Sequence, residues 1–154
     1  MKIKLLAMDV DGTLTDGRIY IGTDGEVMKA FDVKDGYAIV KYIRAGGIPA
    51  IITGRSSAIV EARCRELGIT ELWQGVEDKL ARLRELAEKY SLTPAEIAYI
   101  GDDENDMACM NYAGLSACPA DAMDAVKAAA NYICCHNGGR GAVRELLDHI
   151  MSEK

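Results

Sequence analysis

The sequence contains no apolar run approaching the roughly 18 residues that a membrane span requires. Its first residues form too short an apolar stretch for a signal peptide, so we expect neither a membrane partner nor export. The five cysteines form no Cys-x-x-Cys pair, and their odd number suits neither a disulfide framework nor a zinc site. These absences predict a cytoplasmic protein with reduced thiols.

Positive charge is also scarce, because 18 Lys and Arg residues face 24 Asp and Glu residues, for a formal net charge of -6. Binding to a nucleic acid depends on clustered Lys and Arg, so we expect no nucleic-acid partner. An acidic protein can still bind a small phosphorylated anion where a metal ion and a few basic side chains make the site locally positive. The charge therefore excludes one partner class without excluding a phosphate ester.

Length and composition predict one globular domain over residues 1–154, since 49% of the residues are hydrophobic and 27% are charged. Short apolar runs alternate with longer segments of helical periodicity. The expected strands are residues 3–10, 48–52, 97–100 and 115–117, and the expected helices are residues 37–44, 57–67, 78–90, 106–112, 122–129 and 142–151. This alternation predicts an α/β fold with a doubly wound (Rossmann-like), mainly parallel sheet and helices on both faces.

Two segments depart from this alternation. Strand-like pieces surround the turn signal Thr23-Asp24-Gly25, which predicts a projecting β-hairpin over about residues 17–33. The only glycine-rich stretch opens the expected C-terminal tail, at about residues 137–154.

Two acidic clusters follow expected buried strands. Asp9 and Asp11 end the first strand, and Asp102, Asp103 and Asp106 follow a later one. Carboxylates buried at strand ends require a cation or several N–H groups, and oxygen ligands suit Mg²⁺. A turn aspartate would explain Asp11 alone, and a helix start favours acidic residues. Neither reading explains both clusters, so we expect a magnesium site.

Two weaker signals lie between the clusters. Thr53, Gly54 and Arg55 end a strand with a hydroxyl, a glycine and a cation, which together could receive phosphate oxygens. Lys79 begins an expected helix and could neutralise a phosphoryl group, although a lone lysine is usually a solvated surface residue. Each signal indicates a phosphate-binding site only in combination with the two acidic clusters.

Taken in chain order, Asp-x-Asp-Gly-Thr, strand-Thr-Gly, Lys and Gly-Asp-Asp-x-x-x-Asp resemble the four motifs of the haloacid dehalogenase superfamily. The resemblance implies that Asp9 attacks phosphorus to form an aspartyl-phosphate, and that Asp11 protonates the leaving alcohol and then activates water. Mg²⁺ would bind the carboxylates of Asp9 and Asp102 and the backbone carbonyl of Asp11. Thr53 would bind the phosphoryl group, and Lys79 would neutralise it.

The resemblance leaves the roles of Asp103 and Asp106 open, since either could orient metal-bound water or the lysine. Most members of the superfamily carry an inserted cap domain, but this chain has room only for the hairpin. Segments outside the four motifs, among them Lys29-Ala30-Phe31 and Gly138-Gly139-Arg140-Gly141, also resemble the capless branch typified by the 3-deoxy-D-manno-octulosonate 8-phosphate (KDO 8-phosphate) phosphatases. This resemblance implies a homotetramer built through the hairpins, with shared active sites that the glycine-rich tail of a neighbour reaches.

The substrate implied is a phosphorylated sugar acid. Arg55 after the Thr-Gly pair resembles the eight-carbon enzymes, whereas the related nine-carbon enzymes have Glu there. Arg55, Arg63 and Arg140 are candidates to bind the substrate carboxylate together with Thr53 and Gly54, although each arginine could be a solvated surface cation. A nine-carbon keto-deoxy sugar acid 9-phosphate and a broad range of sugar phosphates remain as alternatives.

Two readings from other classes also remain. A receiver domain is likewise doubly wound and carries clustered Asp, Thr and Lys, but it accepts phosphate on an Asp after a middle strand. An inactive relative kept as a regulatory subunit has no support here, because every catalytic position holds the expected residue type.

Overall fold

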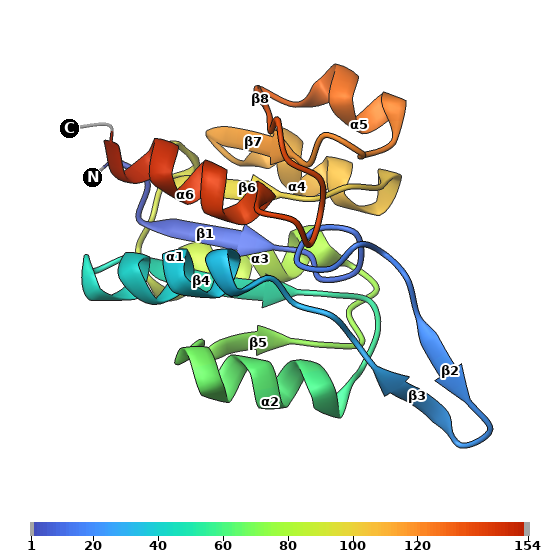
Figure 1. Ribbon diagram of the computed structural model, residues 1–154. Coiled ribbons are helices and arrows are strands. Elements are labelled where there is room, and N and C mark those ends of the chain that lie inside the picture. The colour runs from blue at the N-terminus through green and yellow to red at the C-terminus, as the bar shows by residue number, and fades with distance from the viewer. Residues whose placement is uncertain (1, 153–154) are drawn as a thin grey trace.

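The computed structural model describes residues 2–152 and shows a six-stranded, fully parallel sheet in the order β5-β4-β1-β6-β7-β8 (Figure 1). The strands are β1 (Leu5–Met8), β4 (Ile48–Ile52), β5 (Glu71–Trp73), β6 (Ile97–Ile100), β7 (Leu115–Cys118) and β8 (Tyr132–Ile133). The strand order runs outward in both directions from β1. This confirms the doubly wound α/β fold, whose ligands bind at the carboxyl ends beside the point where the order reverses.

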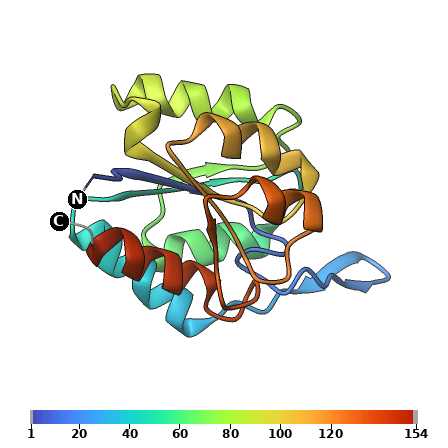
Figure 2. The same ribbon diagram turned by 90° about the horizontal axis from the view of Figure 1, so that it is seen from above.

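Helices cover both faces of the sheet, as Figure 2 shows from above. One face carries α1 (Val33–Arg44), α2 (Ala58–Leu67) and α6 (Ala142–Ser152), and the other carries α3 (Lys79–Lys89), α4 (Met107–Tyr112) and α5 (Asp124–Ala129). Short 3₁₀ turns, η1 (Pro94–Glu96) and η2 (Glu104–Asp106), precede β6 and α4. No cap domain interrupts residues 2–152, and none of their helices is long and apolar enough to cross a membrane.

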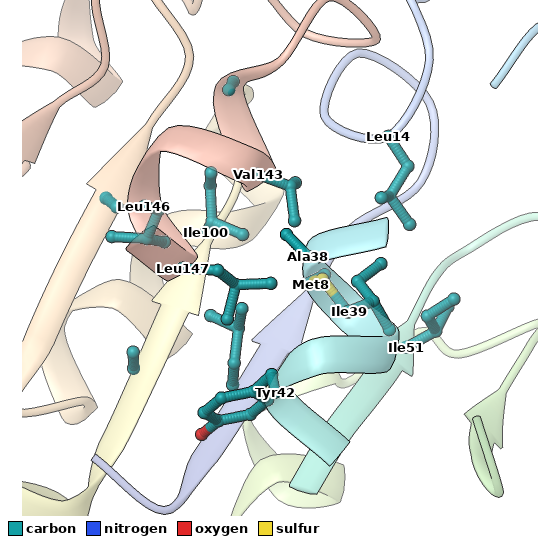
Figure 3. Close-up of a cluster of buried hydrophobic side chains, with 14 of the residues drawn as sticks. Met8, Leu14, Ala38, Ile39, Tyr42, Ile51, Ile100, Val143, Leu146 and Leu147 are labelled. Atoms are coloured by element: carbon teal, nitrogen blue, oxygen red, sulfur yellow. The ribbon is translucent and has the colours of Figure 1, made fainter. Parts of the chain in front are cut away.

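Side chains of β1 alternate between two apolar clusters, because successive residues of a strand point to opposite faces. Leu6 and Met8 pack in the cluster beneath α1 and α6, together with residues such as Leu147 (Figure 3). Leu5 and Ala7 pack in the cluster beneath α3, α4 and α5. Burial on both faces explains why β1 reads as an uninterrupted apolar run.

Three helices begin at capping residues that the sequence places there. The side chain of Asp32 accepts N–H groups at the start of α1, Ser57 caps α2 and Asp78 caps α3. The expected start of the first helix at residue 37 was therefore wrong by one turn, since Asp32 starts the helix at Val33. Two strands had not been predicted, because β5 and β8 have only three and two residues.

The hairpin forms a separate two-stranded antiparallel sheet of β2 (Tyr20–Gly22) and β3 (Gly25–Met28), shorter than the expected span. It projects from the body of the molecule at the side to which the strands of the main sheet point (Figure 1). Its apolar side chains Ile21, Val27 and Met28 are exposed by 70%, 63% and 51%. The hairpin is confirmed, and it presents apolar surface to solvent.

Candidate active site

Three neighbouring strands deliver the predicted catalytic groups to one cleft. β1 leads to Asp9 and Asp11, β4 to Thr53 and β6 to Asp102, and these strands are adjacent in the sheet. The cleft has a volume of about 190 Å³, and its lining residues are Asp9, Asp11, Thr53, Gly54, Arg55, Asp102, Asp103 and Asn105. Of these, Asn105 alone was not named as a candidate from the sequence.

A tight turn after β1 holds two of these carboxylates in place. The carbonyl of Val10 accepts the N–H groups of Thr13, Leu14 and Thr15. Gly12 adopts φ +90°, and a Cβ atom there would lie 2.0 Å from Oδ2 of Asp102. The glycine of the first motif is therefore required for the close approach of Asp102. The Thr13 hydroxyl also donates to Oδ1 of Asp102, at 3.4 Å.

Lys79 is the buried cation of the site. It is the first residue of α3, where the Asp78 cap fixes the helix start, and only 4% of it is exposed. Its ammonium donates to Oδ1 of Asp9 at 3.0 Å and to Oδ1 of Asp106 at 2.8 Å. Burial lowers the pKa of Lys79, but the two carboxylates outweigh that effect and raise the pKa above its ordinary value.

Asp106 orients this lysine. Its carboxylate is fully buried, and besides Lys79 it accepts the Tyr99 hydroxyl at 2.6 Å and the N–H groups of Asp102 and Asp103. Asp103 lies at the rim of the cleft and caps the 3₁₀ turn η2. In this structure Asp106 therefore contacts the lysine, and Asp103 is the one left facing the cleft. The hydroxyl of Tyr99 thus holds Asp106 in place.

Carboxylates crowd at the base of the cleft. Oxygen atoms of Asp9, Asp102 and Asp106 lie within 4.8 Å of one another. Burial raises the pKa of Asp102 to about 8, and repulsion from Asp9 and Asp106 adds to the rise. Burial and the charge of Asp106 likewise raise the pKa of Asp9, while Lys79 opposes them. A cation between these carboxylates would relieve the repulsion.

The donor set fits a hard divalent cation. Asp106 is already engaged by Lys79, Tyr99 and two backbone N–H groups, and it does not line the cleft. Asp9 and Asp102 both line the cleft and are thus the carboxylates available to a metal ion. A site with oxygen ligands alone suits Mg²⁺, which takes one or two carboxylates and completes its shell with water and phosphate.

A second cation reaches the site from the hairpin side and had not been assigned a role. The ammonium of Lys29 donates to Oδ1 of Asp11 at 2.5 Å and lies 2.9 Å from Glu26. Arg55 lies on the other side of Asp11, with its Nε 3.9 Å from Oδ2, and about half of its side chain is exposed. The available signal was the segment Lys29-Ala30-Phe31, but the side chains of a projecting hairpin are usually solvated.

The other predicted substrate contacts fall into two groups. Thr53 is buried and lies at the carboxyl end of β4 beside Gly54. Its backbone forms hydrogen bonds with the backbones of Trp73 and Val76, which hold it there. Arg63 does not line the cleft: it stacks over the Phe31 ring, 5.5 Å from the centroid, and also donates to the Asp32 carbonyl and to Glu66.

The glycine-rich segment braces the catalytic turn of its own chain. The N–H of Gly139 donates to the Thr13 carbonyl, and a Cβ on Gly138 would lie 1.9 Å from the Gly12 carbonyl oxygen. Arg140, which follows, is exposed and does not line the cleft. Helix α6 comes next and packs in the core, so residues 137–152 are an ordered part of the domain.

A family model of haloacid dehalogenase-like hydrolases matches residues 66–147. The 3-deoxy-D-manno-octulosonate 8-phosphate phosphatase KdsC of Escherichia coli K12 is 47% identical over 149 residues, which cover 97% of this chain and 79% of that protein. The chain therefore belongs to the haloacid dehalogenase-like hydrolases. This membership removes the receiver-domain alternative.

Two solved structures narrow the comparison to one kind of phosphatase. The 3-deoxy-D-manno-octulosonate 8-phosphate phosphatase of Moraxella catarrhalis, in complex with magnesium, phosphate and KDO, is 43% identical, with a TM-score of 0.94 over 97% of this chain and 84% of that one. The cobalt-bound enzyme of Haemophilus influenzae is 37% identical, with a TM-score of 0.95 over 97% and 88%. Both match the fold across nearly the whole chain.

Proposed function

We propose that this chain is a Mg²⁺-dependent phosphomonoester hydrolase that converts 3-deoxy-D-manno-octulosonate 8-phosphate to KDO and phosphate. The buried contact of Asp9 with Lys79, beside Asp102 in one cleft, carries the proposal, because it places a carboxylate nucleophile and a phosphate-neutralising cation together. Relatives named for this reaction match 97% of the chain at 47% identity, which supports the substrate.

In the first half of the reaction, an oxygen of Asp9 attacks phosphorus and the phosphorus–oxygen bond to the sugar breaks. Asp9 needs no deprotonating base, but its charge repels the phosphate dianion. Lys79 at 3.0 Å offsets that repulsion, and Thr53 donates to a phosphoryl oxygen. Asp11, on the same turn, gives its proton to the leaving sugar oxygen.

In the second half, water attacks the phosphorus of the aspartyl-phosphate. Asp11, now a carboxylate, takes the proton from this water, and the bond from phosphorus to the Asp9 oxygen breaks. Inorganic phosphate leaves, and both aspartates return to their starting states. The two-residue spacing lets one turn present both groups to the same phosphorus.

The metal belongs to the same proposal. Asp9 and Asp102 would hold Mg²⁺ through their carboxylates, and Asp11 through its backbone carbonyl. When bound, Mg²⁺ screens the negative charge of the phosphate and polarises a phosphoryl oxygen. Asp103, which lines the cleft, would orient water molecules around the metal ion.

Trapping the covalent intermediate tests the mechanism. Asp11→Asn should still be phosphorylated by p-nitrophenyl phosphate, whose leaving group needs no proton, but should hydrolyse the intermediate slowly. Acid quench, borohydride reduction and peptide mass spectrometry should then find the modified residue at position 9. Modification of another residue would refute Asp9 as the nucleophile.

The proposal extends to a homotetramer in the cytoplasm. The hairpin is a two-stranded sheet with exposed apolar side chains, and such a hairpin is marginal in water unless it packs against something. A neighbouring subunit would also supply the wall that a capless cleft lacks. The expectation that the glycine-rich tail reaches a neighbour's cleft is not kept, because this segment packs on the catalytic turn of its own chain. Five cysteines free of disulfides support a reducing compartment.

A further inference from the structure

The base of the hairpin contains a partly buried series of polar contacts that the four motifs do not explain. Lys29, directly after β3, has a side chain that is only 1% exposed. Its ammonium donates to Asp11 at 2.5 Å and pairs with Glu26 at 2.9 Å. Glu26 in turn accepts the Ser57 hydroxyl at 2.5 Å, and Ser57 is the N-cap of α2. This series of contacts thus links the first turn of α2 to the carboxylate of Asp11.

The free-energy cost of burying the Lys29 side chain must be offset by its contacts. Lysine is among the residues least often buried, and removing its charge from water costs free energy unless it is paired. Lys29 is paired with two carboxylates, one of which belongs to the catalytic turn. The remaining oxygen of Asp11 faces Arg55 at 3.9 Å, so Lys29 makes the closer contact to this carboxylate.

We propose that Lys29 is a positioning residue for Asp11, whose carboxylate it holds in the orientation required for proton transfer to the leaving oxygen. This inference rests on the proposed function, in which Asp11 is the acid of the first step. Proton transfer requires the carboxyl group to lie within hydrogen-bond reach of the sugar oxygen, and a change of rotamer would remove it. The base of the hairpin therefore contributes a positioning residue to the active site of its own chain.

Two substrates separate positioning from general damage. A sugar phosphate leaves as an alkoxide that needs a proton, whereas p-nitrophenyl phosphate leaves as a stable anion. Lys29→Met should lower kcat/KM for 3-deoxy-D-manno-octulosonate 8-phosphate on the order of 10²-fold. It should change kcat/KM for p-nitrophenyl phosphate by no more than about threefold, since phosphorylation of Asp9 then needs no acid.

A double-mutant cycle tests the link to Asp11. Lys29→Met and Asp11→Asn should be strongly non-additive for the sugar phosphate, because a misplaced acid and an absent acid are the same defect. Lys29→Arg should recover part of the kcat/KM that Lys29→Met loses on the sugar phosphate. Lys41→Met is the matched control, because Lys41 of α1 pairs with Asp148 of α6 and neither residue lines the cleft, so it should leave turnover of both substrates unaffected.

Glu26→Gln covers the possibility that Lys29→Met does not fold. It keeps Lys29 but weakens the second contact of its ammonium, so it should give a smaller loss with the same sparing of p-nitrophenyl phosphate. Equal losses on both substrates, additive effects in the cycle, or a rise in KM alone would each overturn the positioning role. If wild-type protein turned over neither substrate, the proposed function itself would fail.

Discussion

The ammonium of Lys79 lies 3.0 Å from Oδ1 of Asp9, and both residues are almost fully buried. Asp106 holds the other side of that ammonium at 2.8 Å. The cation therefore cannot leave Asp9 without exposing two carboxylates to each other in a poorly solvated place. Substrate phosphate meets a nucleophile whose charge is already partly neutralised.

Replacing the nucleophile should abolish turnover. Asp9→Asn removes the attacking oxygen but keeps the shape of the side chain, so phosphate release should fall by at least about 10⁴-fold while circular dichroism stays native. Asp124→Asn, an exposed residue of α5, is the matched control and should remain fully active. An active Asp9→Asn protein would transfer the nucleophile role to another residue.

Metal binding should stabilise the fold more at high pH than at low pH. In the metal-free protein the pKa of Asp102 is raised to about 8, so the folded state keeps a proton that the unfolded chain releases near pH 4. The free energy of unfolding without metal therefore falls as pH rises through this window. Mg²⁺ binds the ionised carboxylate and should offset that loss.

Thermal unfolding with MgCl₂ and with EDTA, at about pH 5 and about pH 8, measures the effect. The increase in Tm on adding Mg²⁺ should be larger at the higher pH. Asp102→Asn should remove most of the increase at both values. A Mg²⁺ effect that is independent of pH, or retained in Asp102→Asn, would contradict Asp102 as a ligand.

Arg55 should affect the sugar acid and spare a substrate without a carboxylate. Its guanidinium is half exposed at the cleft, where it can pair with the substrate carboxylate. Arg55→Ala should raise KM for the eight-carbon substrate by roughly tenfold, a loss expected for a hydrogen bond to a charged group. KM for p-nitrophenyl phosphate should barely change. Arg65→Ala, an exposed arginine of α2, provides the control, and equal effects on both substrates would exclude carboxylate recognition.

The hairpin should determine the oligomeric state. Ile21→Glu with Val27→Glu places charges on its exposed apolar surface, so sedimentation velocity should show a tetramer for wild type and a smaller species for the variant. Met123→Glu alters an apolar side chain next to α5 that is 55% exposed, and it should leave the tetramer intact. Monomeric wild-type protein at micromolar concentration would rule out both the tetramer and the proposal that a neighbouring subunit forms one wall of the cleft.

Much of the fold could be predicted from the sequence, because local signals and burial agree. The strands at Ile48–Ile52 and Ile97–Ile100 were placed correctly, since both are apolar and buried on two faces. Ser57 and Asp78 marked helix starts through capping. The edge strands β5 and β8 were missed, because each depends on pairing with a longer neighbour for its existence.

The candidate site was less completely predictable. Asp9, Thr53 and Asp102 each follow an expected strand, and the carboxyl ends of adjacent parallel strands lie at the same edge of a sheet. Their positions in the sequence therefore predicted that they line one cleft, as they do. The contact of Lys29 with Asp11 joins residues 18 positions apart, and local sequence patterns do not encode such a contact. Arg63 looked suitable by charge alone, but its guanidinium stacks on Phe31.

The most direct measurement is Mg²⁺-dependent phosphate release from a small panel of esters. The panel contains 3-deoxy-D-manno-octulosonate 8-phosphate, its nine-carbon 9-phosphate homologue, hexose phosphates and a nucleotide. The account predicts the highest kcat/KM for the eight-carbon acid, with little activity in EDTA. Preference for the nine-carbon acid, or equal rates on simple sugar phosphates, would contradict the substrate assignment, and no release from any ester would contradict the proposed phosphatase function.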